Sequence, residues 1–180
     1  MKIAITGSGR DLGLAIASHY ENVQEFRRDM LYDIHRPQEI LDELEDDVEV
    51  FINNAQDFTF GQVNMFKALF DHWRDTNKLI INVSSLAPDW AHSRKDVRMY
   101  DVQKGALDTA SKMAFHTRGI HVANLRCSYI DTPWIRKRKI PENKMLKFDE
   151  VITAIDYIMM MHQKGIQVGV VELQRDASVY

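Results

Sequence analysis

Short apolar runs alternate along the chain with stretches that have the period of an amphipathic helix, and this alternation limits what the chain can fold into. The apolar runs predict six strands, at residues 2–6, 23–26, 48–53, 78–83, 122–127 and 167–173. The stretches between them predict helices at residues 12–20, 37–46, 62–74, 99–117 and 148–163. Strands that alternate with helices form a parallel sheet covered on both faces. We therefore expect one α/β domain, residues 1–180, built on a doubly wound parallel sheet.

The segment after the second apolar run fits this plan least well. Only RRDM, residues 27–30, separates VQEF (23–26) from LYD (31–33). A crossover between parallel strands needs about a dozen residues or more. We therefore predict that LYD is an irregular edge segment, that the sheet has six parallel strands, and that residues 23–26 lie at one edge.

The composition is that of an ordinary soluble globular protein. Hydrophobic residues make up 45% of the chain, and the net charge of −3 does not indicate binding to nucleic acid or to a membrane surface. No run approaches the roughly 18 apolar residues of a membrane span, and MKIAITG lacks the apolar length of a signal peptide. The single cysteine, Cys127, excludes an internal disulfide, and the histidines lack metal-ligand spacing. We expect a cytoplasmic protein without a metal site.

A glycine-rich turn, GSGRDLG, joins the first strand to the first helix. Its glycines would let the backbone approach a pyrophosphate, which the helix N-terminus would bind through unpaired N–H groups. Taken alone, the same pattern also fits a tight turn without a ligand. Asp11 stands where such a loop usually has glycine, and we expect it to cap the helix and to adopt a left-handed backbone. Arg10 would offset its charge.

Tyr100 and Lys104 in MYDVQKG are four residues apart and so share one face of the fourth predicted helix. A free tyrosine, with a pKa near 10, is a poor acid–base group at neutral pH. An ammonium about 4 Å away could lower that pKa by roughly 2–3 units. The Tyr100 and Lys104 pair alone is not distinctive. It indicates a functional site only together with Ser84 and Ser85, which end the strand that precedes this helix.

Other polar residues also stand where strands end. Asn53 and Asn54 end the third strand, and Thr132 follows the strand at 122–127 in the sequence IDTPW. Ligand sites of open α/β sheets lie at this edge. The ordered set of glycine turn, Asn-Asn-Ala, Ser-Ser, Tyr-x-x-x-Lys and Asp-Thr-Pro spans nearly the whole chain and resembles the short-chain dehydrogenase/reductase family.

That resemblance implies a Rossmann-type fold and hydride transfer between a nicotinamide cofactor and a small-molecule carbonyl or alcohol. It implies that Ser85 holds the substrate oxygen, that Tyr100 is the acid–base group, and that Lys104 lowers the tyrosine pKa and binds the nicotinamide ribose. The cofactor-binding residues that it implies are Gly7, Ser8, Arg10, Asp11, Leu12, Gly13, Arg27, Arg28, Asp33, Asn53, Asn54, Ala55, Tyr100, Lys104 and Thr132.

In this family, a basic residue before the middle glycine or after the second strand accompanies NADP rather than NAD. Arg10 holds the first position here, and Arg27 and Arg28 hold the second. Guanidinium groups bind phosphate in a bidentate manner, which suits an adenosine 2′-phosphate. Asp29 is a possible NAD-type carboxylate, but it lies beyond both arginines. We therefore expect NADP(H), with Asp33 contacting the adenine amino group.

Departures from the family pattern leave a second hypothesis open. The chain is markedly shorter than typical members, and the asparagine that often serves a proton relay has only Asn64 as a counterpart, too near the start of its helix. The alternative is therefore a non-catalytic NADP-binding sensor or scaffold on the same fold. Relatives pair through the helices predicted at 62–74 and 99–117, so we expect a homodimer or homotetramer.

The segment that follows Thr132 is short and basic, which indicates an open substrate site. The run IRKRK, residues 135–139, could bind an acidic substrate, although a solvated loop is the favoured interpretation. Trp90 and Trp134 flank the inferred site in sequence and would either shape a substrate pocket or pack the loops.

Overall fold

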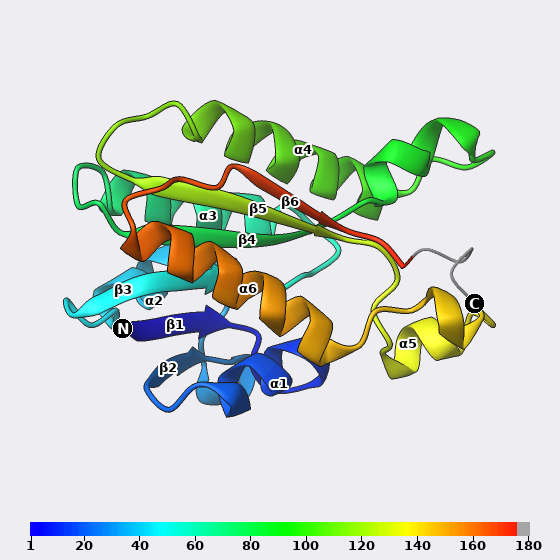
Figure 1. The fold of residues 1–180 in the computed structure, drawn as a ribbon, viewed down its shortest axis with the longest axis horizontal. Helices are drawn as coiled ribbons and strands as arrows, with labels where there is room; N and C mark the ends of the chain where they lie inside the picture. Colours follow the sequence, from blue (N-terminus) through cyan, green and yellow to red (C-terminus); the bar gives the residue numbers. More distant parts are fainter. Residues whose placement is uncertain (176–180) are drawn as a thin grey trace.

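Six parallel strands form one sheet in the order β2-β1-β3-β4-β5-β6, as Figure 1 shows. The structure, a computed structural model, describes residues 1–175. The strands are β1 (Lys2–Thr6), β2 (Val23–Phe26), β3 (Val48–Asn53), β4 (Leu79–Ser85), β5 (His121–Cys127) and β6 (Val170–Leu173). Central strands such as β4 are buried along their whole length, which is why their sequences are near-continuous apolar runs.

Helices cover both faces of the sheet and create two hydrophobic cores. One core lies beneath α1 (Asp11–His19) and α6 (Phe148–Gln163), the two helices in front of the sheet in Figure 1. The other lies beneath α2 (Pro37–Asp42), α3 (Gly61–His72) and α4 (Met99–Ala114). Phe51 and Ile80 point into the second core and are fully buried. This arrangement confirms the doubly wound α/β architecture.

The short link at residues 27–30 predicted that residues 23–26 lie at an edge of the sheet, and the structure agrees. β2 is the terminal strand and pairs with β1 in parallel. The residues after it form a single 3-10 turn, η1 (Arg28–Met30), which ends at Leu31 in a left-handed conformation with φ of 71°. Residues 31–33 contain no strand. The prediction of six strands with 23–26 at one edge is therefore confirmed.

Several predicted boundaries differ from those observed. The helix predicted at 37–46 ends at Asp42, the helix at 99–117 ends at Ala114, and the last strand begins at Val170 rather than at residue 167. Besides η1, three other short segments were not predicted: η2 (Ala87–Ser93), α5 (Pro133–Arg136) and η3 (Glu142–Lys144). In residues 1–175, no helix is long and apolar enough to cross a membrane.

Candidate active site

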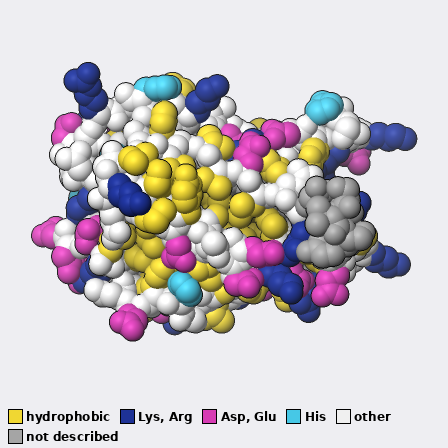
Figure 2. Space-filling view, viewed as in Figure 1, with side chains coloured by type: hydrophobic (Ala, Val, Ile, Leu, Met, Phe, Trp, Pro, Cys, Tyr) yellow, Lys and Arg dark blue, Asp and Glu magenta, His cyan; other side chains and the backbone are white. Residues whose placement is uncertain are grey.

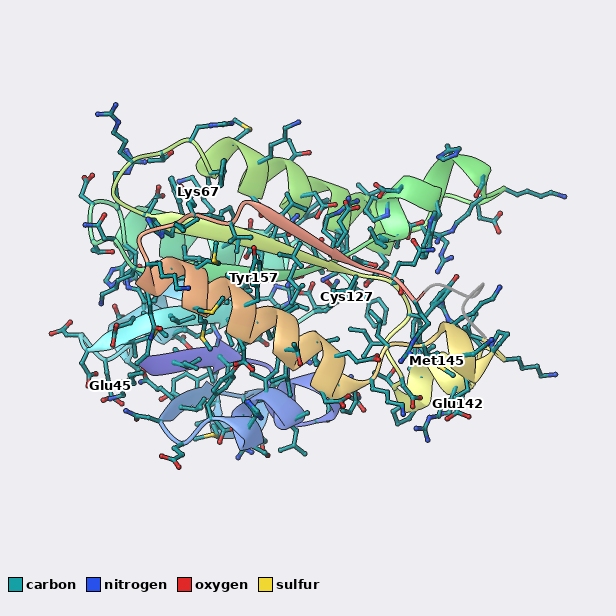
Figure 3. All side chains as sticks on the ribbon, in the orientation of Figure 1. Glu45, Lys67, Cys127, Glu142, Met145 and Tyr157 are labelled. Atoms are coloured by element: carbon teal, nitrogen blue, oxygen red, sulfur yellow. The ribbon has the colours of Figure 1, made fainter. Side chains whose placement is uncertain are left out.

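The residues singled out in the sequence gather where the parallel strands end. β1 runs into the glycine turn, β3 into Asn54 and β4 into Ser85, all at one edge of the sheet. Figure 3 labels Cys127 at this edge, near the end of β5, whereas Glu45 lies at the opposite edge. Burial raises the pKa of the Cys127 thiol to about 12, so the thiol is neutral and inert at neutral pH.

Two glycines of the turn are required by close backbone packing. Gly7 has a φ of +74°, and a Cβ there would lie 2.9 Å from the Cα of Ala55. At Gly13, a Cβ would lie 2.0 Å from the carbonyl oxygen of Gly7. At Gly9 the nearest atom would be 3.7 Å away, on the side chain of Arg27, so that glycine borders open space. The turn thus presents bare backbone toward the end of the sheet.

A pocket of about 560 Å³ opens over this turn. Ten of the residues predicted to bind a cofactor line it: Gly7, Arg10, Asp11, Leu12, Gly13, Arg27, Arg28, Asp33, Asn54 and Ala55. Sequence reasoning did not assign the rest of the lining, which is Gly9, Phe26, Asp29, Tyr32, Ile34, Ile40 and Gln56. Most of these follow β2, where the glycine turn and the end of that strand meet. The pocket therefore has a backbone floor, apolar walls and a charged rim.

Each arginine at the rim lies near an aspartate. Arg10 Nε is 3.7 Å from Asp11 Oδ2, Arg27 Nε is 3.4 Å from Asp29 Oδ1, and Arg28 Nε is 3.6 Å from Asp33 Oδ2. The side chains of Arg10 and Arg28 are 90% and 73% exposed, so these ion pairs are weak and leave most of the guanidinium N–H groups free to bind another anion.

Asp33 is held in place at the rim. Its Oδ1 accepts a hydrogen bond of 3.0 Å from the backbone N–H of His35. This hydrogen bond, followed by the charges of Arg28, His35 and Arg36, lowers the pKa of the Asp33 carboxyl against the opposing effect of burial. Asp33 is therefore ionised and directed by the backbone.

Asp11 corrects one prediction and agrees with another. It adopts the expected left-handed backbone, with φ of 49°. It does not cap the helix: α1 begins at Asp11 itself, the N-cap is Arg10, and no side chain makes the capping hydrogen bond. An N-cap residue must precede the first helical turn, and Asp11 is one position too late.

Four predicted cofactor residues either lie outside the pocket lining or have a structural contact in addition to a place in it. Ser8 and Asn53 are fully buried and lie outside the pocket lining. Thr132 Oγ1 accepts a 3.3 Å hydrogen bond from the N–H of Ile135 and so caps α5. Asn54 lines the pocket, but its amide donates to the carbonyls of Thr6 and Gly7. Asn54 thereby ties the glycine turn to β3.

Ser85, rather than Ser84, faces Tyr100. The two serines are neighbours on β4 and point to opposite faces of the sheet. Ser84 Oγ donates to Asp108 of α4. Ser85 Oγ accepts a 3.1 Å hydrogen bond from the N–H of Ala87, and it lies close enough to the Tyr100 phenol to lower the phenol's pKa. The end of β4 and the start of α4 therefore bring these two hydroxyls together.

The pKa of Tyr100 is raised, which corrects the expectation that Lys104 lowers it in this structure. Burial is the main cause, although 37% of the residue surface is exposed. The nearby Ser85 hydroxyl and the charge of Arg138 lower the Tyr100 pKa, but their effects are weaker than that of burial. Lys104 Nζ lies 5.7 Å from the centroid of the Tyr100 ring.

The Lys104 ammonium is buried and points toward other acceptors. Its Nζ donates to Gln62 Oε1 at 2.7 Å and to the carbonyl oxygen of Val83 at 2.8 Å. Burial lowers the pKa of Lys104 to about 8, and the charge of Asp108 opposes this change. Lys104 is thus a buried amine that titrates close to neutral pH.

Gln62 is the residue that sequence reasoning missed. Its Nε2 donates to the carbonyls of Asn53 (2.7 Å) and Val83 (3.0 Å) while its Oε1 accepts from Lys104. Asn64, the only relay candidate in the sequence, is exposed on the same helix. A glutamine at the start of a helix carries no distinctive signal, so only the placement of α3 against β3 and β4 could have found it.

Comparison with known proteins supports the fold. No family model matches the chain, and no curated protein matches it. Among solved structures, a gluconate 5-dehydrogenase from Burkholderia cenocepacia, in complex with NADP and tartrate, matches with a TM-score of 0.74 and 16% identity, over 99% of this chain and 95% of that one. An alcohol dehydrogenase from Thermococcus sibiricus, complexed with 5-hydroxy-NADP, gives 0.71 and 19%, over 97% of both chains.

A short-chain dehydrogenase from Sphingobium yanoikuyae, in complex with NADPH, matches with a TM-score of 0.69 and 15% identity, over 94% of this chain and 87% of that one. At these identities the likeness concerns the arrangement of the backbone. The α/β fold that the sequence resemblance implied is therefore confirmed: this chain has the Rossmann-type fold of short-chain dehydrogenases.

Proposed function

We propose that this protein is an NADP(H)-dependent oxidoreductase of the short-chain dehydrogenase/reductase type, which reduces a small-molecule carbonyl or oxidises the corresponding alcohol. One observation carries the proposal. The Ser85 hydroxyl lies close enough to the Tyr100 phenol to lower its pKa, and Lys104 lies one helical turn further along α4. Gln56 connects this group to the pocket over the glycine turn, because it lines that pocket and donates to Gln103 of α4 at 3.1 Å.

The pocket fits a nicotinamide dinucleotide phosphate in its backbone and in its charge. Side chains are excluded at Gly7 and Gly13, which leaves bare backbone and the N-terminus of α1 for a pyrophosphate. Arg10 and Arg28 offer exposed guanidinium groups for a further phosphate. Phe26, Tyr32 and Ile34 would enclose an adenine ring. When bound, the nicotinamide would exchange a hydride with the carbon of the substrate.

The protein's own residues would handle the substrate oxygen and its proton. The Ser85 hydroxyl is oriented by the N–H of Ala87 and would donate a hydrogen bond to the developing oxyanion. Tyr100 would donate the proton; its raised pKa keeps the phenol protonated at neutral pH, the form that acts as an acid. Lys104, charged below its pKa of about 8, would bind the nicotinamide ribose.

The alternative is an NADP-binding sensor or scaffold without catalysis, and one observation favours it. The Lys104 ammonium donates to Gln62 and to the carbonyl of Val83, and it makes no hydrogen bond with the Tyr100 phenol, whose pKa is raised. A reductase needs that contact in its working state, whereas a sensor does not.

A screen of aldehydes, ketones and oxo acids with NADPH separates the two functions. If the wild-type protein consumes NADPH, seen as a loss of its absorbance, and the Tyr100→Phe variant does not, the oxidoreductase is supported. Binding of NADPH in a calorimeter, without turnover of any compound, supports the sensor. If neither NADPH nor NADH binds, both functions are wrong.

A further inference from the structure

Arg126 carries a charge on an interior strand of the sheet. It lies near the end of β5, and its side chain is only 12% exposed. Its neighbours Leu125 and Cys127 belong to the core beneath α6. Because side chains alternate along a strand, Arg126 points to the opposite face of the sheet, which α4 covers. A buried guanidinium is costly without compensating partners, so this face must supply them.

Three carboxylates from three different elements meet the Arg126 guanidinium. Its Nη2 donates to Asp89 of η2 at 2.5 Å, its Nε donates to Asp108 of α4 at 3.1 Å, and its Nη1 donates to Glu172 of β6. Asp89 and Glu172 are half-exposed, whereas Asp108 is mostly buried. One side chain of β5 thus joins three further elements at the edge of the sheet where the candidate active site lies.

Asp108 fixes α4 on the sheet. Its Oδ1 accepts a hydrogen bond of 2.5 Å from Ser84 Oγ, while its Oδ2 accepts the hydrogen bond from Arg126. Ser84 directly precedes Ser85 on β4, and Asp108 lies one helical turn after Lys104 on α4. These contacts therefore set how the helix that carries Lys104 lies on the strand that carries Ser85.

Asp89 fixes the near end of η2, which is the end next to Ser85. The N–H of Ala87, the first residue of η2, donates to Ser85 Oγ at 3.1 Å, and Asp89 lies two residues further on. The far end of η2 is held separately, because Arg94 pairs there with Asp101 of α4. The ion pair between Asp89 and β5 therefore holds the part of η2 that orients the Ser85 hydroxyl.

We propose that Arg126 is a positioning residue of the oxidoreductase. Through Asp89 it holds the turn that orients the Ser85 hydroxyl, and through Asp108 it holds α4 against the sheet. This inference rests on the proposed function, because it concerns the groups that would handle the substrate oxygen. A displacement of about 1 Å can lower the rate of an enzyme by about a hundredfold, so contacts of this kind affect turnover as well as stability.

The charge of Arg126 has a second consequence, at Lys104. The Asp108 carboxylate favours the charged form of Lys104 and raises its pKa against the effect of burial. Arg126 pairs with the same carboxylate, so its positive charge weakens that effect. Cys127 on β5 also acts on Lys104, but its thiol is neutral at neutral pH, as is the Tyr100 phenol. Removal of the guanidinium should therefore raise the pKa of Lys104, whereas removal of the Asp108 charge should lower it.

Amide hydrogen exchange, followed by NMR, tests the positioning without a substrate. Arg126→Gln and Asp89→Asn should each increase the exchange rate of the Ala87 amide by about tenfold or more, as expected for the loss of one charge-assisted contact. Arg126→Lys keeps a cation and should restore part of the protection. Lys2→Gln is the matched control and should leave the Ala87 amide unchanged. Lys2 is 15% exposed and also pairs with two carboxylates, but at the opposite edge of the sheet, where β1 begins.

The pH at which NADPH affinity is lost provides a readout that a purely structural role would not move. Arg126→Gln should shift this midpoint upward and Asp108→Asn should shift it downward, whereas Asp89→Asn should leave it in place. Fluorescence titration of NADPH measures the midpoint, and thermal unfolding shows which variants are folded. If Arg126→Gln does not fold, Asp89→Asn and Asp108→Asn still break its contacts one at a time.

Turnover completes the test once the screen has found a carbonyl substrate. Arg126→Gln and Asp89→Asn should lower kcat by roughly tenfold to a hundredfold and change the KM for NADPH little, and Arg126→Lys should recover part of the rate. Unchanged exchange at Ala87 overturns the inference. Faster exchange with an unchanged kcat also overturns it, because the contact then serves stability alone. If the exchange and the midpoint change as expected but the wild type turns over no carbonyl compound, the oxidoreductase is wrong and the structural effect of Arg126 on Ser85 stands.

Discussion

Lys104 Nζ donates to Gln62 Oε1 over 2.7 Å, and both side chains are buried. The contact joins α4 to α3 beneath the candidate active site. It gives the lysine an acceptor that an apolar side chain could not provide, and a buried ammonium without partners would be costly. The state of Lys104 therefore depends on the residue at position 62.

Changing Gln62 should shift the pH at which cofactor affinity is lost. Lys104 is charged below its pKa of about 8, so NADPH affinity should fall as the pH rises through that value. Gln62→Glu places a negative charge beside the ammonium and should move the midpoint upward by about one unit or more. Gln62→Leu removes the acceptor and should move it downward. Asn64→Leu, at an exposed position of the same helix, should leave it unchanged.

Fluorescence titration of NADPH at a series of pH values measures these midpoints, with thermal unfolding as a check that each variant is folded. If all variants share the wild-type midpoint, Gln62 does not control the ionisation of Lys104.

Arg28→Ala should weaken NADP(H) and leave NAD(H) almost unchanged. One charge-assisted contact to phosphate contributes about 1.5–3 kcal/mol, which corresponds to roughly a tenfold to hundredfold change in affinity. Arg10→Ala should have the same effect. The matched control is Arg36→Ala, because Arg36 is exposed, pairs with Glu39 and lies outside the pocket lining. The Kd values of both cofactors are measured by calorimetry. If Arg28→Ala weakens the binding of NADP(H) and NAD(H) equally, Arg28 does not recognise the 2′-phosphate.

Tyr100→Phe should abolish most turnover while cofactor binding survives. The change keeps the ring but removes the proton, so the rate should fall by at least the roughly 10²–10⁴ that general acid–base catalysis contributes. Lys104→Ala should also weaken NADPH, because the same ammonium would serve the ribose. Tyr157→Phe, on the half-exposed face of α6, is the matched control. A Tyr100→Phe protein that turns over a substrate like wild type would falsify the mechanism.

The homo-oligomer remains a prediction, and α4 offers a surface for it. Val102 and Met113 are exposed and lie three helical turns apart on one face of α4. Figure 2 shows a second apolar area over α6 and β6. Met160 of α6 is also exposed. If the helices at 62–74 and 99–117 form the interface, Val102→Asp should yield monomers and Met160→Asp should not. Sedimentation velocity at micromolar concentration measures both, and a wild-type monomer would contradict the prediction.

Strand positions could be predicted because a central strand that is buried on both faces must have a nearly continuous apolar sequence. Residues 2–6, 23–26 and 48–53 were predicted with the observed bounds. Helix ends were harder, as at 37–46, where acidic residues after Asp42 give no capping or breaking signal. The short segments η2 and α5 depend on tertiary contacts, since they are too brief to have a period of their own.

The same limit applies to the candidate site. That Asn53 and Asn54 face opposite sides follows from the alternation of side chains along a strand, but which of them faces the pocket depends on how β3 sits in the sheet. Gln62 could not be found because its contact depends on the rotation of α3. The clustering of strand-end residues could be predicted, whereas their individual contacts could not.

Acid should destabilise the fold through His121 and His162. His121 begins β5, at the end of the strand away from the candidate site, and His162 lies in the last turn of α6. Their Nδ1 atoms are 2.8 Å apart, so one ring must donate and the other must be a neutral acceptor. Burial lowers the pKa of both histidines. At His162 the charge of His121 lowers the pKa further, whereas the charge of Glu49 opposes this change.

Because both pKa values are lower in the folded protein, the unfolded chain binds more protons at mildly acidic pH. The stabilisation is complete above the unfolded pKa of about 6.5 and is lost as the pH falls through the folded values. The midpoint temperature of thermal unfolding of the wild-type protein should therefore decrease as the pH is lowered from about 7.5 to about 5, the range in which histidine titrates. In His162→Gln, whose side chain does not titrate, that fall should be smaller, whereas His92→Gln, in an exposed turn, should behave like wild type. Identical pH profiles for wild type and His162→Gln would show that this histidine pair does not govern the acid response.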